Sequence, residues 1–253
     1  MLVDTHAHVN FNAYKDDADE VIRRSLDDGT WIINVGSQYS TSKRAIELAE
    51  KYEKGVYAAI GLHPIYARDG FDYKKYEQLA QSSKVVAIGE IGLDYKEEYA
   101  SFEEEQKNIF LKQLEFAKNL HLPIIFHCRM AHKDLIKILN EWEVAGNDQL
   151  KGVVHCFTGN WTQAEKYLAM GLSLGFNGII FKMNLDDIIK RTPLDKILVE
   201  TDCPYLTPPS AGIERNEPIY VRHVAEKITQ IKDTGYEEMS KITTENAKKL
   251  FNI

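Results

Sequence analysis

Histidine and carboxylate side chains recur in this chain directly after short apolar runs. The first ten residues, MLVDTHAHVN, place Asp4, His6 and His8 at intervals of two. Side chains alternate between the two faces of a strand, so we expect these three to point the same way. On the inner face of a barrel, His6 and His8 would hold one cation. Asp4, one layer below, would orient a ligand imidazole through its second nitrogen.

Five more apolar runs end in the same kinds of side chain. The residues that follow these runs are His63, Glu90, His127, His155 and Asp202, in the segments IGLHP, AIGEIGLDY, IIFHCR, VVHCFTG and LVETDCPYL. A single histidine at a strand end is more often a hydrogen-bonded structural residue than a ligand, but the shared position favours a joint site. Glu90 is the strongest member, because a nearly buried carboxylate is costly unless it is paired or bound to a cation.

This set of donors favours transition metals. Imidazoles and carboxylates without thiolates suit Zn, Mn, Fe, Co or Ni. Cys128 and Cys156 each follow a histidine directly, so alternation turns them away from the ligands. The candidates are numerous enough for two ions, with Glu90 as the shared carboxylate at the spacing of ~4 Å that hydrolytic sites use. Glu200 has the parity of Asp202 and is expected to face inward, as an outer ligand or a supporting group.

Two further residues are weaker candidates for the site, and three histidines are expected to lie outside it. Ser37 and Asn177 follow the second and seventh runs. His121 and His223 are expected to be structural residues, and His132, at the start of a predicted helix, is expected to lie on the surface.

The elements that would position these side chains alternate along the chain. Strands are predicted at residues 2–5, 31–35, 57–61, 85–89, 124–126, 152–154, 172–175 and 197–200. Helices are predicted at residues 17–28, 41–52, 73–81, 102–120, 131–143, 162–170, 185–190 and 221–231. Eight βα units in 253 residues favour a closed TIM (β/α)8 barrel, which is an α/β fold with its chemistry at the carboxyl ends of the strands; a doubly wound sheet is the alternative.

We predict one domain over residues 1–253, a metal-dependent hydrolase barrel. Its last stretch, SKITTENAKKLFNI, should form a closing helix that begins at a threonine N-cap and docks on the barrel.

The composition narrows the possible partners and compartment. A net charge of −7 gives no basic field over the whole surface for nucleic acid, so an anionic substrate would need a local positive site. The three cysteines, none in a CxxC motif, favour a reducing compartment. No apolar run approaches the ~20 residues of a membrane span. We therefore expect a cytoplasmic protein with no membrane association and no obligate protein partner.

Seven motifs together extend over essentially the whole chain. They are DTHAH, GLHP, GEIGLDY, HCR, HCFTG, ETDCPYL and NEP, in that order. This ordered set resembles the TatD family of metal-dependent deoxyribonucleases, within the wider amidohydrolase-like hydrolases. The resemblance implies a TIM barrel, hydrolysis of DNA phosphodiester bonds at single strands or ends, and two divalent ions, with a third in some members. Mg or Mn would support activity, and Zn or another transition metal could also bind.

The resemblance also implies roles for individual residues. The expected metal ligands are His6, His8, Glu90, His127, His155 and Asp202. The first two and Asp202 would hold one ion, Glu90 would bridge, and the other two histidines would complete the second site. Asp202 would orient or deprotonate the attacking water, so Asp202 and Glu90 are the expected catalytic residues.

Four further residues are expected to contact the substrate. His63 and Arg129 match positions that face the phosphate, and Tyr95 and Tyr205 could stack on a base or sugar. Two departures from the family pattern affect this set: Ile65 stands where a second histidine is common, and Ala211 precedes Gly212 where an arginine is common. Glu214, Arg215 and Asn216, which lie on the same predicted rim loop, could partly substitute.

Two alternative functions remain open on the sequence alone. The same barrel could hydrolyse another ester, such as a small phosphoester, a lactone or an aminoacyl-tRNA ester. Glu90 at the bridging position, where related amidohydrolases often use a modified lysine, favours the nuclease. A binding protein with a vestigial site is the other alternative, and the complete set of ligands argues against it.

Overall fold

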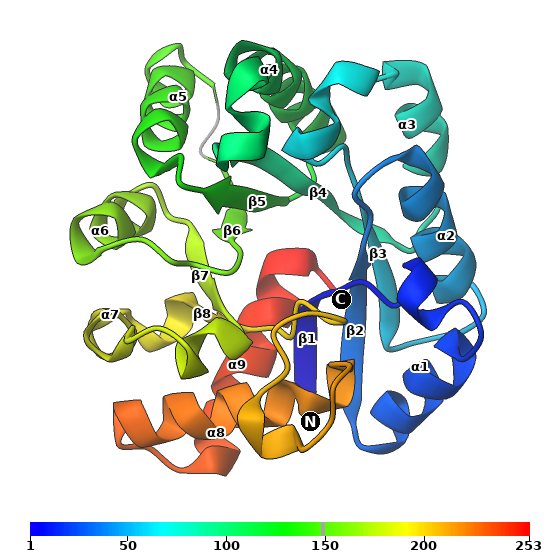
Figure 1. Ribbon diagram of the computed structural model, residues 1–253, viewed down its shortest axis with the longest axis vertical. Coiled ribbons are helices and arrows are strands. Elements are labelled where there is room, and N and C mark those ends of the chain that lie inside the picture. Colours follow the sequence, from blue (N-terminus) through cyan, green and yellow to red (C-terminus); the bar gives the residue numbers. More distant parts are fainter. Residues whose placement is uncertain (148–149) are drawn as a thin grey trace.

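The computed structural model describes residues 1–147 and 150–253 and forms a barrel of parallel strands (Figure 1). Within the described residues, eight strands pair in sequence order, and neighbouring strands are parallel. The strands are β1 (Leu2–Ala7), β2 (Thr30–Val35), β3 (Val56–Ile60), β4 (Val85–Asp94), β5 (Ile124–Arg129), β6 (Gly152–Val154), β7 (Ser173–Phe176) and β8 (Ile197–Val199). The predicted (β/α)8 barrel is confirmed, and the doubly wound alternative is wrong.

Helices surround this barrel as an outer ring in Figure 1, except the last helix, which lies near the centre of the view. They are α1 (Ala18–Asp27), α2 (Tyr39–Ala49), α3 (Tyr73–Leu79), α4 (Glu103–Leu120), α5 (His132–Val144), α6 (Trp161–Ala169), α7 (Asp186–Arg191), α8 (Val221–Lys232) and α9 (Tyr236–Phe251). The eight helices predicted from apolar spacing all occur, with ends shifted by at most three residues. Among the described residues no helix is both long enough and apolar enough to cross a membrane.

The barrel closes between its last and first strands through the segment that follows β8. The backbone N–H of Asp202 donates to the carbonyl of His6 at 2.8 Å, and that of His8 donates to the carbonyl of Cys203 at 2.9 Å. Ala7 and Cys203 form a parallel bridge at the same level. Closure of the barrel therefore fixes three of the predicted metal ligands against one another through their main chains.

Strands β1, β4 and β5 end later than their apolar runs suggested. β4 extends to Asp94 and β5 to Arg129, and β1 likewise extends to Ala7, so Glu90, His127 and His6 lie inside strands and not beyond them. His127 pairs with Gly92 of β4, whereas Glu90 lies where the pairing of β4 with β5 shifts register, between Ile88 and Ile91.

The closing helix begins earlier than predicted. α9 starts at Tyr236, and the Thr243 hydroxyl donates to the carbonyl of Met239 inside the helix, so the predicted threonine N-cap is wrong. The additional turn buries Met239 completely, which the apolar spacing of the last residues alone did not indicate. α9 lies near the centre of Figure 1, where Ala247 and Phe251 pack with Val3 of β1 and residues of other strands.

Replacing Phe251 by alanine is expected to lower the free energy of unfolding by about 3 to 5 kcal/mol. The ring is 2 % exposed and packs against the barrel interior, so its loss leaves a cavity. Denaturant unfolding of the variant measures the effect. Leu111→Ala on α4, at an exposed position, is the matched control and should change stability by only about 0.5 kcal/mol. Equal losses in the two variants would contradict a closing role for α9.

Candidate metal centre

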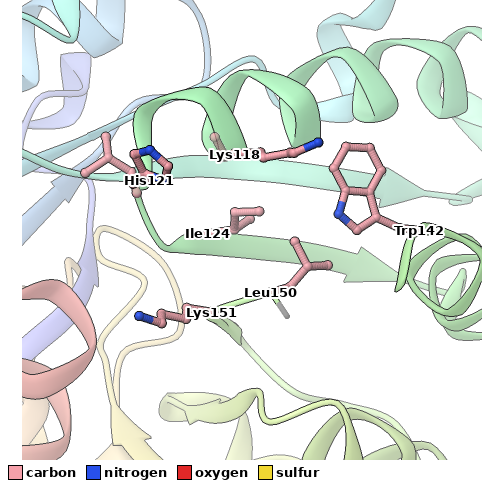
Figure 2. Close-up of a pocket in the computed structure, with 8 residues that line it drawn as sticks. Lys118, His121, Ile124, Trp142, Leu150 and Lys151 are labelled. Atoms are coloured by element: carbon pink, nitrogen blue, oxygen red, sulfur yellow. The ribbon is translucent and has the colours of Figure 1, made fainter. Parts of the chain in front are cut away.

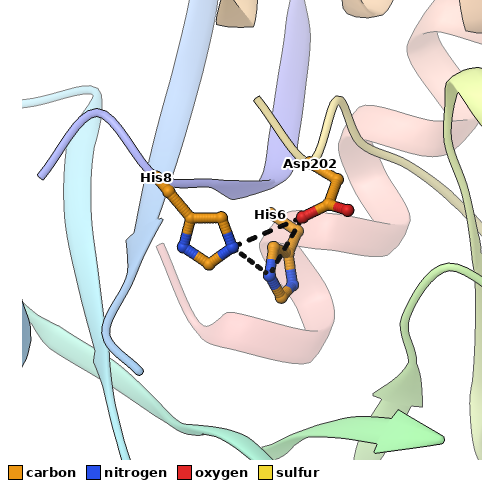
Figure 3. Close-up of side chains that lie close together, drawn as sticks. All are labelled: His6, His8 and Asp202. Atoms are coloured by element: carbon orange, nitrogen blue, oxygen red, sulfur yellow. Dashed lines mark hydrogen bonds and ion pairs between the residues drawn. The ribbon is translucent and has the colours of Figure 1, made fainter. Parts of the chain in front are cut away.

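His6, His8 and Asp202 converge at the mouth of the barrel (Figure 3). The His6 Nε2 and His8 Nε2 atoms are 3.1 Å apart, and Asp202 Oδ1 lies 3.3 Å from His8 Nε2 and 3.9 Å from His6 Nε2. His8 Nδ1 lies 2.8 Å from the carbonyl of Val35, which can only accept, so Nδ1 carries the proton and Nε2 presents a lone pair when the ring is neutral. A lone pair and a carboxylate oxygen directed at one point fit a cation.

Glu90 lies at the centre of the remaining histidines. Its Oε2 atom is 2.9 Å from His155 Nε2, 3.1 Å from His127 Nδ1 and 3.8 Å from His6 Nε2. Its Oε1 atom is 3.8 Å from both His8 Nε2 and His63 Nε2. Glu90 thus belongs to two further groups of possible ligands, one with His6 and His155 and one with His63 and His127. A carboxylate shared in this way suits a site with two ions and leaves a position for a third.

Two carboxylates hold the outer nitrogens of these imidazoles. Glu200 Oε1 lies 3.3 Å from His155 Nδ1 and accepts hydrogen bonds from the Cys156 backbone N–H and the Asn177 amide. Glu200 is therefore a supporting group within this chain, one of the two roles expected for it. Asp94 Oδ2 lies 3.2 Å from His127 Nε2. Such partners fix the orientation of a ligand imidazole and raise its basicity.

Asp94 is the functional residue that the sequence reasoning missed. It stands four residues after Glu90 in GEIGLDY, inside the same strand, so alternation places both on one face. The four-residue spacing of Glu90 and Asp94 in the sequence already indicates that the two carboxylates share a face of the strand.

Asp4 does not orient an imidazole, contrary to the prediction. Its carboxylate accepts hydrogen bonds from the backbone N–H and hydroxyl of Thr201 and from the backbone N–H of His6. Among the described residues the His6 Nδ1 atom has no hydrogen-bond partner. The pairing of β1 with β2 shifts register between Asp4 and Ala7, and this irregularity interrupts the simple alternation on which the prediction depended. Asp4 instead ties β1 to the segment that carries Asp202.

The electrostatics of the cluster favour bound positive charge. Burial opposes ionisation of Glu90, but the surrounding imidazoles, His63 first, lower the pKa of this carboxyl well below its usual value. Burial also disfavours a charged His155, yet Glu90 and Glu200 outweigh it and raise the pKa of that ring. Burial, with the neighbouring His127, lowers the pKa of His63 to about 3. Protons and metal ions therefore compete for the same nitrogen atoms.

Three of the four predicted substrate residues lie at this site. His63, Arg129 and Tyr205 line a cavity of about 240 Å³ over Glu90 and Asp202, and Ile65 gives that cavity an apolar wall. Tyr95 does not line it; its hydroxyl donates to Asp134 on α5 at 2.9 Å. A role for Tyr95 in substrate binding stays a prediction, without support from its position.

The rim loop before α8 is tied to the barrel. Arg215 pairs with both oxygens of Asp17 and also with Glu217, so it is not free to replace the arginine expected before Gly212. Asn216 is fully buried, and its amide donates to the carbonyls of Thr201 and Tyr205 at 3.1 and 2.7 Å. Asn216 thereby positions the segment that contains Asp202.

Replacing Asn216 by alanine is expected to destabilise the protein by about 2 kcal/mol, because two buried carbonyls lose their donor. Activity should fall as well, since Thr201 and Tyr205 flank Asp202. Thermal unfolding and the rate of hydrolysis measure the two effects. Asn119→Ala, which removes one exposed hydrogen bond on α4, is the control. Unchanged thermal stability in the Asn216 variant would contradict this role.

A further cavity lies away from these residues (Figure 2). It has a volume of about 260 Å³ and lies against α4 and α5, beside Ile124 at the start of β5. One of its two lysines, Lys118, donates to the side-chain oxygen of Asn147 at 2.7 Å and lies over the Trp142 ring. In a parallel barrel the starts of the strands face away from the mouth, so this cavity is separate from the candidate metal centre.

Comparison with known proteins agrees with the geometry of the site. Residues 3–252 match the family model described as TatD related DNase. The chain is 43 % identical to the uncharacterized metal-dependent hydrolase YabD of Bacillus subtilis, over the full length of both. It is 33 % identical to the 3′-5′ ssDNA/RNA exonuclease TatD of Pectobacterium parmentieri, again over both full lengths.

A solved structure gives the same result. The TatD homologue YJJV of Escherichia coli superimposes with a TM-score of 0.89 at 30 % identity, over 100 % of this chain and 98 % of that one. The chain therefore belongs to the TatD-related DNase family of metal-dependent hydrolases.

Proposed function

We propose that this protein is a divalent-metal-dependent nuclease that cleaves phosphodiester bonds of single-stranded DNA from an end. The observation that carries the proposal is the position of Glu90, one buried carboxylate shared by imidazoles of several strands beneath a small open cavity. The relative from Pectobacterium parmentieri, a 3′-5′ ssDNA/RNA exonuclease, supports the choice of substrate.

In this proposal the first ligand set is the cluster of His6, His8 and Asp202. The second set joins His127 and His155, whose Nδ1 and Nε2 atoms lie 3.4 Å apart and both approach Glu90 Oε2. His6, His8 and Asp202 hold one ion, His127 and His155 hold the second, and Glu90 is shared between them. Bound divalent ions would neutralise the phosphate and make a water acidic enough to attack near neutral pH. Asp202, whose side chain is 17 % exposed at the cavity, orients this water and accepts its proton.

Two uncommitted arginines flank the site and could hold the strand. Within residues 1–147 and 150–253, neither the Arg129 nor the Arg44 guanidinium has an ion-pair or hydrogen-bond partner. Arg129 lines the cavity over Glu90, and Arg44 lines a neighbouring polar cavity of about 430 Å³, which shares Tyr205 with it. The two guanidinium groups supply positive charge next to the site, although the net charge of the chain is −7.

The test is release of nucleotides from an end-labelled single-stranded oligonucleotide, after chelation and re-addition of Mg²⁺, Mn²⁺ or Zn²⁺. Metal content is measured in parallel. We expect activity to require the ion and to disappear in His127→Ala, whereas His223→Ala on α8 should retain it. Hydrolysis that survives chelation or the His127 variant would contradict the proposal. A preference for a lactone or carboxylic ester over DNA would replace it with the alternative hydrolase.

A further inference from the structure

A second, larger cavity adjoins the metal cluster. It has a volume of about 910 Å³, within the range of small-molecule binding sites. Arg129, His155 and Asp202 line both this cavity and the smaller one over Glu90. A phosphate bound at this boundary would place the rest of its nucleotide in one of the two cavities. The smaller cavity is lined by the metal ligands, so the larger one is the place for the sugar and base.

The outer wall of the larger cavity is apolar and exposed. Met130 is 75 % exposed and Tyr205 56 % exposed, and Met183 also belongs to the exposed large hydrophobic residues. All three line the cavity, together with Ile179 and Leu206. Thioether side chains adapt to flat ligands, and an aromatic ring stacks on any nucleobase. Exposed apolar side chains gathered around one cavity indicate a ligand with a flat apolar face.

The lining of this cavity also contains a buried imidazole with one unpartnered nitrogen. His132 was expected on the surface, but it is only 7 % exposed and lines this cavity. Its Nδ1 atom lies 3.0 Å from the Tyr167 hydroxyl and 3.2 Å from Cys128 Sγ. Its Nε2 atom has no partner among the described residues. A buried polar nitrogen without a partner is costly, which points to a ligand atom that completes it.

The state of this ring follows from its neighbours. Burial lowers the pKa of His132 to about 4, so the ring is neutral at pH 7. The Tyr167 hydroxyl donates to Cys128 Sγ at 3.8 Å, and the Cys128 thiol, 3.2 Å from Nδ1, can donate to that nitrogen. A neutral imidazole that accepts at Nδ1 carries its proton on Nε2. The nitrogen available to a ligand is therefore a donor, which suits the acceptor nitrogens and carbonyls of nucleobases.

We propose that this cavity, which we call the base cavity, binds the nucleobase of the nucleotide whose phosphate lies over the metal cluster, with His132 Nε2–H donating to the base. The inference deepens the proposed nuclease function and rests on it for the identity of the ligand. It assigns recognition of the base to residues that follow β5, β6, β7 and β8 and that are not metal ligands.

The test measures equilibrium binding and needs no hydrolysis. Isothermal titration of the Mn²⁺-loaded protein compares dAMP with 2-deoxyribose 5-phosphate, which lacks only the base. Stacking contributes enough per base that we expect dAMP to bind about tenfold or more tightly. Thr158→Trp, which places an indole on the wall of the cavity, should abolish this preference and leave the affinity for the sugar phosphate unchanged. Thr162→Trp, exposed on α6 and outside the lining, is the matched control.

Two outcomes would overturn the inference: equal affinities of the wild type for the two ligands, or an unchanged preference for dAMP in Thr158→Trp. Failure of the proposed function looks different, because a protein that prefers dAMP but cleaves no DNA would keep the base cavity and lose the nuclease. Cleavage of DNA without any preference for dAMP would support the nuclease function and refute the base cavity.

A second pair of variants isolates the donor. His132→Phe keeps a ring in place but removes Nε2–H, and it should raise the dissociation constant for dAMP about tenfold. Tyr167→Phe removes the hydroxyl next to Nδ1 and leaves the donor, so affinity should stay within about twofold of the wild type. A purely structural role for His132 would make the two variants alike in dAMP affinity, and that result would refute its role as a donor.

Discussion

Glu90→Gln is expected to reduce metal-dependent hydrolysis by about 10³-fold or more and to lower the bound metal by at least one equivalent. Five imidazole nitrogens lie within 3.8 Å of this one carboxylate, two on one oxygen and three on the other. The amide has nearly the same shape but no negative charge, and its NH₂ group repels a cation. Both candidate ion positions should weaken together, because each uses the same side chain.

Metal content per chain and the rate on single-stranded DNA measure the two effects. Glu98→Gln is the matched control, since that carboxylate is exposed and, among the described residues, forms an ion pair only with Lys96. A variant that kept its full metal content but lost activity would limit Glu90 to a role in the reaction. A variant that kept both would remove the basis of the proposed function.

The periodicity of the sequence was sufficient to predict the barrel and most of the candidate site. Each apolar run becomes one strand of a parallel sheet, and parallel strands in a closed barrel bring their carboxyl ends to one rim. His127 and His155 follow such runs and therefore meet Glu90 there. The position of these residues at the rim depends only on the order of the strands and helices, so errors of a few residues in the predicted ends do not change it.

The contacts of the site that could not be predicted leave no periodic pattern in the sequence. The register shift in β1 turns Asp4 toward Thr201, and no pattern in MLVDTHAHVN indicates it. The burial of His132 depends on Tyr167, which is 35 residues away on a different helix. The engagement of Arg215 by Asp17 likewise joins segments 198 residues apart. Long-range partners of this kind are set by tertiary packing, so local spacing carries no information on them.

Asp202→Asn is the second change with a large expected effect, a loss of about 10³-fold in the rate of hydrolysis at nearly unchanged stability. Asp202 has a left-handed backbone with φ of 57°, a conformation that asparagine also tolerates well. Its main-chain hydrogen bond to His6 does not involve the side chain. The substitution therefore removes the charge beside His8 and the proton acceptor while it preserves the closure of the barrel.

Asp233→Asn provides a matched control, because Asp233 is exposed and has a similar φ of 52° at the end of α8. Thermal unfolding should give the same midpoint for both variants and the wild type, whereas the rate on single-stranded DNA should fall only in the Asp202 variant. A lower midpoint in that variant alone would mean that the carboxylate stabilises the fold through its neighbours. Full activity with normal stability would show that His6, His8 and Glu90 suffice, and the assignment of Asp202 as ligand and proton acceptor would then be wrong.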